Sequence, residues 1–210
     1  QAPASLRQKD DCGLAAFAVA QQLEQPQQFA EAADAYQQVE KLSHDPTKVA
    51  RSLLRAAEIY ADRLSQPGPA VELCQRILSS HPAEVAAEDA LRAMVRWRRA
   101  DPTLLPELDA LAKKQSQHIP LASFAWLLSA QLAEEQGTVP DAVRRYDELA
   151  RRYPKGPLLD DALIAAAKLL RGQKRYGEAA ERLERLQRTY TSALIVGHYN
   201  LYLLSEGALL

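Results

Sequence analysis

The chain has 210 residues, of which 47% are hydrophobic and 25% charged, and 26 basic residues face 27 acidic ones for a net charge of −1. This balance is typical of a folded globular protein, and it gives no overall field toward nucleic acid or anionic membranes. Only 8 glycines and 6% aromatic residues argue against an all-β fold. No apolar run approaches the roughly 18 residues of a membrane span.

Residues 1–12 show no helical periodicity, and we expect a flexible lead-in there. The chain starts at Gln1 without a methionine, which indicates either a processed terminus or a truncated start. From Gly13 onward, apolar residues recur at helical spacing, and the inward face expected for the first helix consists of Ala16, Val19, Ala20 and Leu23. The expected helices, in chain order, are about 13–24, 27–43, 47–64, 70–80, 84–99, 104–116, 120–137 and 140–153, then a helix pair within 153–190 and an unpaired helix at 192–204.

The segment 153–190 shows the repeating unit most clearly. Two apolar stripes run along it, separated by the break RGQKRYGE, and they consist of Leu163, Ala166, Ala167 and Leu170, and of Ala179, Ala180, Leu183, Leu186 and Tyr190. One such hairpin cannot bury both stripes by itself, so it needs neighbours of the same kind. Joints recur every 34–38 residues, at Pro46, Pro82, Pro120, Pro154 and Thr191. This period, with two helices in each repeat, predicts stacked helical hairpins.

The fourth unit carries a family resemblance. Nine of its residues recur at the fixed offsets of a known repeat pattern: Trp126, Ser129, Ala130, Ala133, Gly137, Ala142, Tyr146, Leu149 and Pro154. This arrangement resembles the tetratricopeptide repeat. The resemblance implies an all-α, right-handed α-solenoid of about five hairpins over residues 13–190, followed by a terminal capping or interaction helix in 191–210. It also implies a protein–protein interaction scaffold that binds partner segments in a concave groove.

A narrower likeness concerns the joints. HPAEVAAEDAL (81–91) and YPKGPLLDDAL (153–163) are similar to the joints of bacterial cell-envelope tetratricopeptide proteins, which include outer-membrane assembly lipoproteins and periplasmic coordinators of envelope constriction. The likeness implies a scaffold for other envelope proteins, in the periplasm or associated with the outer membrane, with a lipid anchor on a removed N-terminal segment as one option. A cytoplasmic adaptor is the alternative.

The sequence offers no candidate catalytic or metal site. His44, His81 and His118 occupy the same joint position in three successive repeats, too far apart to share a metal ion. No HExxH, phosphate-binding glycine loop or GxSxG motif is present. Cys12 and Cys74 form no motif. We therefore expect no enzymatic activity, no cofactor, no metal, no nucleic-acid partner and no small-molecule substrate.

The resemblance places the partner-binding groove on the first helix of each pair. Arg92, Arg96 and Arg99 share one face, and Phe124 with Leu127 would form an apolar saddle. This set predicts a groove for an acidic peptide or a C-terminal carboxylate, with solvated charges on an amphipathic helix as the alternative. The predicted groove residues are Arg51, Glu58, Arg92, Arg96, Arg99, Phe124, Leu127, Gln131, Lys168 and Arg171, and the same pattern positions include Leu54 and Asp89.

The C-terminal segment is a second candidate interaction surface. It is apolar nearly all round, with Tyr199, Tyr202 and Leu203 among its large residues. A closing helix of a repeat array normally has a polar outer face. The segment therefore indicates further repeats, a homodimer, or docking of the chain as a structural subunit of a large assembly.

Overall fold

The computed structural model describes residues 4–25 and 27–189, with side chains from residue 11 onward. These residues form ten α-helices and no strand, which confirms the predicted all-α fold. The chain divides into two compact units, residues 1–104 and 105–210.

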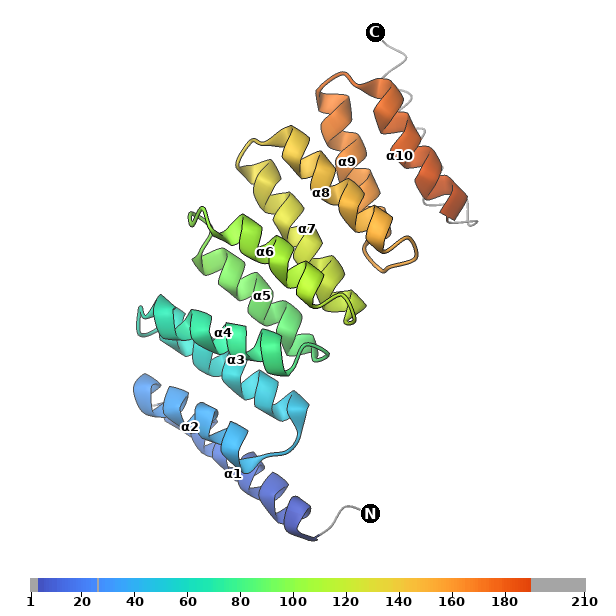
Figure 1. Ribbon diagram of the computed structural model, residues 1–210. Helices are drawn as coiled ribbons and strands as arrows, with labels where there is room; N and C mark the ends of the chain where they lie inside the picture. Colours follow the sequence, from blue (N-terminus) through green and yellow to red (C-terminus); the bar gives the residue numbers. More distant parts are fainter. Residues whose placement is uncertain (1–3, 26, 190–210) are drawn as a thin grey trace. The chain divides into compact units, whose positions relative to one another are not determined.

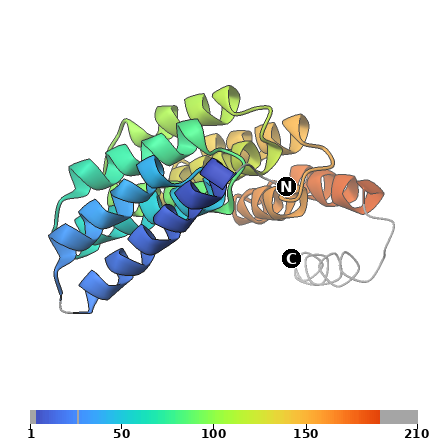
Figure 2. The same cartoon turned by 90° about the horizontal axis from the view of Figure 1, so that it is seen from below.

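The first unit contains five helices: α1 (Ala4–Glu24), α2 (Phe29–Leu42), α3 (Pro46–Asp62), α4 (Pro67–Ser80) and α5 (Val85–Trp97). Each helix packs on the next, and α3 also contacts α5 (Figure 1). Figure 2 shows the same pairs from below, with the chain reversing its direction at each short loop. The first unit is thus built from helical hairpins that pack against one another, as the repeat period predicts.

The second unit holds α6 (Leu104–Lys114), α7 (Ile119–Glu135), α8 (Val139–Arg152), α9 (Leu159–Gly172) and α10 (Tyr176–Thr189). Helix α6 begins at the last residue of the first unit. Helices α7 to α10 pack in chain order. Their core is mostly alanine and leucine, and one part of it consists of Val143, Ala167, Leu170, Ala179 and Leu183.

Polar contacts between successive hairpins show the period directly. In the first unit, Arg96 and Trp97 on α5 both donate to the Asp62 carboxylate, 34 and 35 residues earlier, at 3.0 and 3.2 Å. In the second unit, Arg182 on α10 donates to Asp147 on α8, 35 residues earlier, at 2.7 Å. Such contacts join equivalent positions of neighbouring repeats. The residue separation between their partners therefore matches the repeat period seen in the sequence.

A tyrosine–glutamate hydrogen bond recurs within hairpins. The Tyr36 hydroxyl on α2 donates to Glu24 at 2.7 Å, and the Tyr146 hydroxyl on α8 donates to Glu134 at 3.0 Å. Both pairs are 12 residues apart, and both tyrosine rings are almost completely buried. Each bond satisfies a phenol that its own packing would otherwise leave without a partner.

The turns inside four hairpins use one left-handed residue each. Gln27, Ser65, Gly137 and Lys174 have φ values of 61, 56, 74 and 61°, and they follow α1, α3, α7 and α9. Glycine adopts this conformation freely, whereas each of the other three carries a strain of about 1 kcal/mol. The same turn geometry therefore persists in hairpins that lack the glycine of the repeat pattern.

The helix starts follow the proline joints. Asp45 caps α3, because its carboxylate accepts the backbone N–H groups of Thr47 and Lys48 at 3.0 and 3.3 Å. Pro46 follows in the first turn, where its missing N–H costs nothing. Pro120 lies in the first turn of α7 in the same way, and the turns within two hairpins place Pro67 and Pro140 in the first turns of α4 and α8.

Two expectations about the N-terminal region need correction. Helix α1 begins at Ala4 rather than at Gly13, so the predicted lead-in over 1–12 is helical for most of its length. Its inward face is also shifted. Val19, expected inside, is 50% exposed, whereas Phe17 packs edge-on against Tyr36 with ring centroids 5.3 Å apart. Gly13 lies against Ser43, whose Cβ would be 2.6 Å from a Cβ at position 13.

The two cysteines are free and differ in environment. Cys74 on α4 is fully buried and Cys12 is exposed. Burial raises the pKa of the Cys74 thiol to about 12. Since the thiolate is the reactive form, Cys74 is inert in the folded chain. The capping or interaction helix predicted for 191–210, with Tyr199, Tyr202 and Leu203, lies outside the described residues.

Candidate functional site

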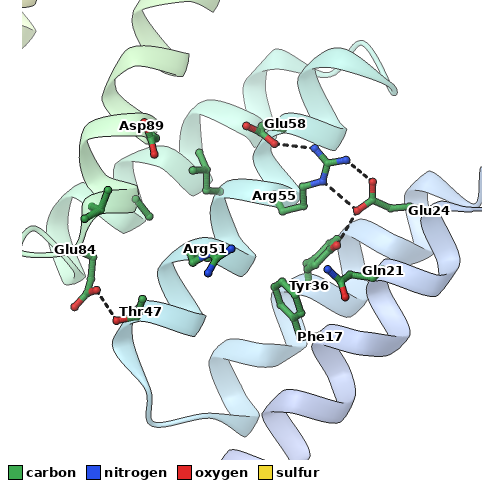
Figure 3. A pocket seen from close by; sticks show the side chains of 13 residues that line it. Phe17, Gln21, Glu24, Tyr36, Thr47, Arg51, Arg55, Glu58, Glu84 and Asp89 are labelled. Carbon is green, nitrogen blue, oxygen red and sulfur yellow. Dashed lines mark hydrogen bonds and ion pairs between the residues drawn. The ribbon is translucent and has the colours of Figure 1, made fainter.

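The first unit has a hollow of about 740 Å³ on the side formed by α1, α3 and the start of α5 (Figure 3). Helix α2 contributes Tyr36 to its wall. We call it the first-unit hollow. Its lining residues are Phe17, Gln21, Glu24, Tyr36, Thr47, Arg51, Leu54, Arg55, Glu58, Glu84, Val85, Ala86 and Asp89.

One wall of the first-unit hollow is an ion-pair chain centred on Arg55. Its guanidinium donates to the Glu24 carboxylate at two positions, one of them at 3.0 Å, and to Glu58 at 2.9 Å. The Tyr36 hydroxyl also donates to Glu24. The hydrogen bonds from Arg55 hold the pKa of Glu24 below its usual value, although partial burial opposes them. This chain ties α1, α2 and α3 together.

The opposite wall is more open. The Thr47 hydroxyl on α3 donates to Glu84, which precedes α5, at 2.8 Å. Val85 in the first turn of α5 is 79% exposed. Asp89 accepts from Arg92 at 3.3 Å, and both of these side chains are largely exposed. Among the described residues, the exposed Arg51 side chain makes no hydrogen bond or ion pair.

A smaller hollow of about 250 Å³ adjoins the first along α3 and α5. The two share Leu54, Glu58 and Asp89 in their linings. The smaller one adds Arg92 and Arg96 from α5. Together they form a continuous recessed surface of the first unit.

The structure places several predicted groove residues on this surface. Arg51 and Glu58 line the first-unit hollow, and Arg92 and Arg96 line the adjoining one. Arg99 is exposed but belongs to neither lining. The arginines are accompanied by acids, since Arg92 contacts Asp89 and Arg96 contacts Asp62. The arginine pattern in the sequence does not show these partners, which offset part of the positive charge that it predicts for this surface.

The predicted apolar saddle also needs correction. Phe124 and Leu127 are only 7 and 8% exposed. Helix α7 is apolar on nearly every face, and such a helix is buried all round. These two side chains therefore serve packing and offer little surface to a ligand. Gln131 and Lys168 are exposed and Arg171 is half-buried. All five residues belong to the second unit, whereas the two hollows described above lie in the first.

Sequence reasoning missed several lining residues, above all Glu24, Arg55, Glu84 and Val85. Glu24 had a detectable signal, because the tyrosine–glutamate spacing of 12 occurs in two hairpins. Val85 had another, since it is a large apolar residue outside the stripe of α5, where Leu91 and Met94 point inward. Arg55 carried no local signal, because its main partner is 31 residues away.

The second unit has a buried polar cluster of a different kind. Arg145 on α8, with 7% of its side chain exposed, forms ion pairs with Asp109 on α6 at 3.2 Å and with Asp141 at 3.3 Å. The Ser129 hydroxyl on α7 donates to Asp109 at 2.6 Å. Arg145, Asp109 and Ser129 thus join three helices at a mostly buried position, so their role is structural.

The described part of the chain holds neither a metal site nor a membrane span. No group of three histidine, cysteine, aspartate or glutamate side chains there could hold a metal ion. None of the helices that the structure describes combines the length and hydropathy required for a membrane crossing.

Comparison with known proteins matches one hairpin of the chain to a repeat family. Residues 124–156, which cover most of α7 and all of α8, match the tetratricopeptide repeat family. This hairpin is therefore similar to a tetratricopeptide repeat, and the match falls on the unit in which the sequence shows the resemblance. No curated protein matches the chain. Among solved structures, the crystal structure of the MamA protein is similar over 86% of this chain and 93% of its own, with 14% identity and a TM-score of 0.44.

Proposed function

We propose that this protein is a non-catalytic interaction scaffold that binds a segment of a partner protein in the first-unit hollow. The observation that carries the proposal is the hollow itself, a recess of about 740 Å³ with both apolar and charged lining. This volume lies in the range of specific ligand sites. The tetratricopeptide repeat in α7 and α8 supports the general role, because repeat arrays present extended surfaces to protein partners.

The chemistry of the lining favours a peptide over a reacting substrate. Leu54 and Val85 expose apolar surface on facing helices of the hollow, where a partner side chain could be buried. The Glu24 and Glu58 carboxylates are held by Arg55, and Glu84 is held by Thr47. Groups fixed in this way suit recognition, whereas general acid–base catalysis needs a group whose pKa is tuned toward the working pH.

A random peptide library displayed on phage and selected on the full chain tests this function. We expect peptides whose affinity falls at least about tenfold when Leu54→Gln and Val85→Gln are combined, because two apolar contacts are lost. The matched control combines Leu14→Gln with Val19→Gln. These are exposed residues of the same types on α1, outside the lining, and their replacement should leave affinity unchanged. Equal affinity for the two double variants, measured by fluorescence anisotropy, would contradict the proposal.

We also propose a bacterial cell-envelope setting, in which the partners are other envelope proteins. The support is the similarity of the joints at 81–91 and 153–163 to those of envelope tetratricopeptide proteins. Fractionation of the native host tests it, with expected recovery alongside periplasmic or outer-membrane markers. Recovery with cytosolic markers alone would favour the adaptor alternative.

A further inference from the structure

We propose that the first-unit hollow selects a partner segment in which a bulky apolar side chain is adjacent to a lysine or arginine. This inference rests on the function proposed above and specifies the chemistry of the partner. It differs from the acidic ligand that the arginine pattern in the sequence predicts.

The lining of the hollow carries an excess of negative charge. Four carboxylates line it, from Glu24, Glu58, Glu84 and Asp89, against the two guanidinium groups of Arg51 and Arg55. Arg55 is shared by two of the carboxylates, Glu24 and Glu58. A recess with an excess of one sign attracts ligands of the opposite sign and disfavours like-charged ones. The hollow therefore favours a basic ligand.

Two of the four carboxylates are within reach of a partner. Among the residues that the structure describes, Glu84 is held only by the neutral Thr47 hydroxyl, so its charge is not compensated by that bond. Asp89 pairs with Arg92 through a 3.3 Å contact in which the two side chains are 51 and 62% exposed. Exposed pairs of this kind contribute little to stability. A cation of the partner can therefore replace Arg92 at Asp89 at little cost.

Apolar surface lies directly beside these carboxylates. Val85 follows Glu84 in the chain and is 79% exposed, and Ala86 and Leu54 continue the apolar lining. Lysine and arginine carry apolar stems as well as charged ends. A segment with a bulky residue against Val85 and Leu54 can thus place the stem of a neighbouring basic residue along the same surface, with its charge at Glu84 or Asp89.

An acidic segment would meet the opposite situation. Arg51 and Arg55 are the only positive charges that the described residues bring to the lining, and Arg55 already contacts two carboxylates. In the adjoining hollow, Arg92 and Arg96 already contact Asp89 and Asp62. At these three arginines an acidic ligand would have to displace carboxylates, and at Arg51 it would lie among the four carboxylates of the lining, which like-charge repulsion opposes.

The test uses library-selected peptides whose affinity depends on Leu54 and Val85. We expect them to be enriched in lysine or arginine beside a bulky apolar residue. Changing those basic residues to glutamate in synthetic versions should weaken binding at least about tenfold. The double variant Glu84→Gln with Asp89→Asn should remove most of this preference. The matched control, Glu31→Gln with Glu72→Gln, neutralises two exposed glutamates of the first unit outside the lining and should preserve it.

Two outcomes separate this inference from the function on which it rests. Peptides that depend on Leu54 and Val85 but are acidic or uncharged would overturn the charge selection and leave the hollow as the binding site. The charge selection is also overturned if the basic preference survives in the Glu84→Gln, Asp89→Asn variant. Peptides whose affinity does not depend on Leu54 and Val85 would contradict the proposed function, and the charge inference with it.

Discussion

Replacing Arg145 with methionine is expected to lower the free energy of unfolding of the second unit by about 3 kcal/mol. Arg145 is 7% exposed in its side chain and pairs with Asp109 and Asp141. Methionine fills much of the same volume but leaves Asp109, only 17% exposed, with the Ser129 hydroxyl as its remaining partner. A carboxylate left uncompensated in the interior costs far more than the lost attraction between two exposed charges.

The neighbouring arginine supplies the control. Arg144 also pairs with Asp141, at 2.5 Å, but its side chain is 60% exposed. Arg144→Met should therefore change stability by no more than about 0.5 kcal/mol. Urea unfolding followed by Trp126 fluorescence in a Trp97→Phe background reports on the second unit, since the chain has only these two tryptophans. Similar losses of unfolding free energy in the two arginine variants would show that burying the Arg145 ion pairs does not increase their contribution to stability.

A second substitution identifies the cause of the loss. Adding Asp109→Asn to the Arg145→Met variant removes the uncompensated charge while keeping an oxygen for the Ser129 hydroxyl. We expect this double variant to be more stable than Arg145→Met alone. An additive further loss would mean that Arg145 acts through packing rather than through its charge.

The helices were predictable because their signals are local. Apolar stripes at helical spacing and prolines at the joints lie within a few residues of each other. The start of α1 was missed for the same reason. Residues 4–12 carry no apolar stripe, yet most of them are good helix formers, and propensity continues a helix that is already nucleated further along.

The candidate site was predictable only in outline. The repeat pattern assigns Arg51, Leu54, Glu58 and Asp89 to one surface, and all four line the same hollow, because helix faces follow from spacing. The pattern could not show how the charges combine. The partner of Arg96 is Asp62, 34 residues earlier on another helix, and no local spacing reveals it. The burial of Phe124 was missed because the repeat pattern assigns that position to the concave surface.

Leu53 and Leu54 are adjacent on α3 but face opposite environments, and replacing each with alanine should give opposite results. Leu53 is completely buried, so Leu53→Ala should lower the free energy of unfolding of the first unit by about 3 kcal/mol through lost burial and the cavity left behind. Leu54 is half-buried and lines the hollow. Leu54→Ala should cost less than about 1 kcal/mol and instead weaken peptide binding.

Cys74 offers a direct measurement of this difference. Its buried thiol lies on α4, which packs on α3, and it can react with a thiol-specific dye only when the first unit opens, whereas the exposed Cys12 reacts at once. A loss of about 3 kcal/mol in Leu53→Ala should raise the labelling rate of Cys74 by about two orders of magnitude, since each 1.4 kcal/mol is a factor of ten. Leu54→Ala should raise it less than about tenfold. Equal labelling rates in the two variants would contradict the assignment of these neighbours to the core and to the binding surface.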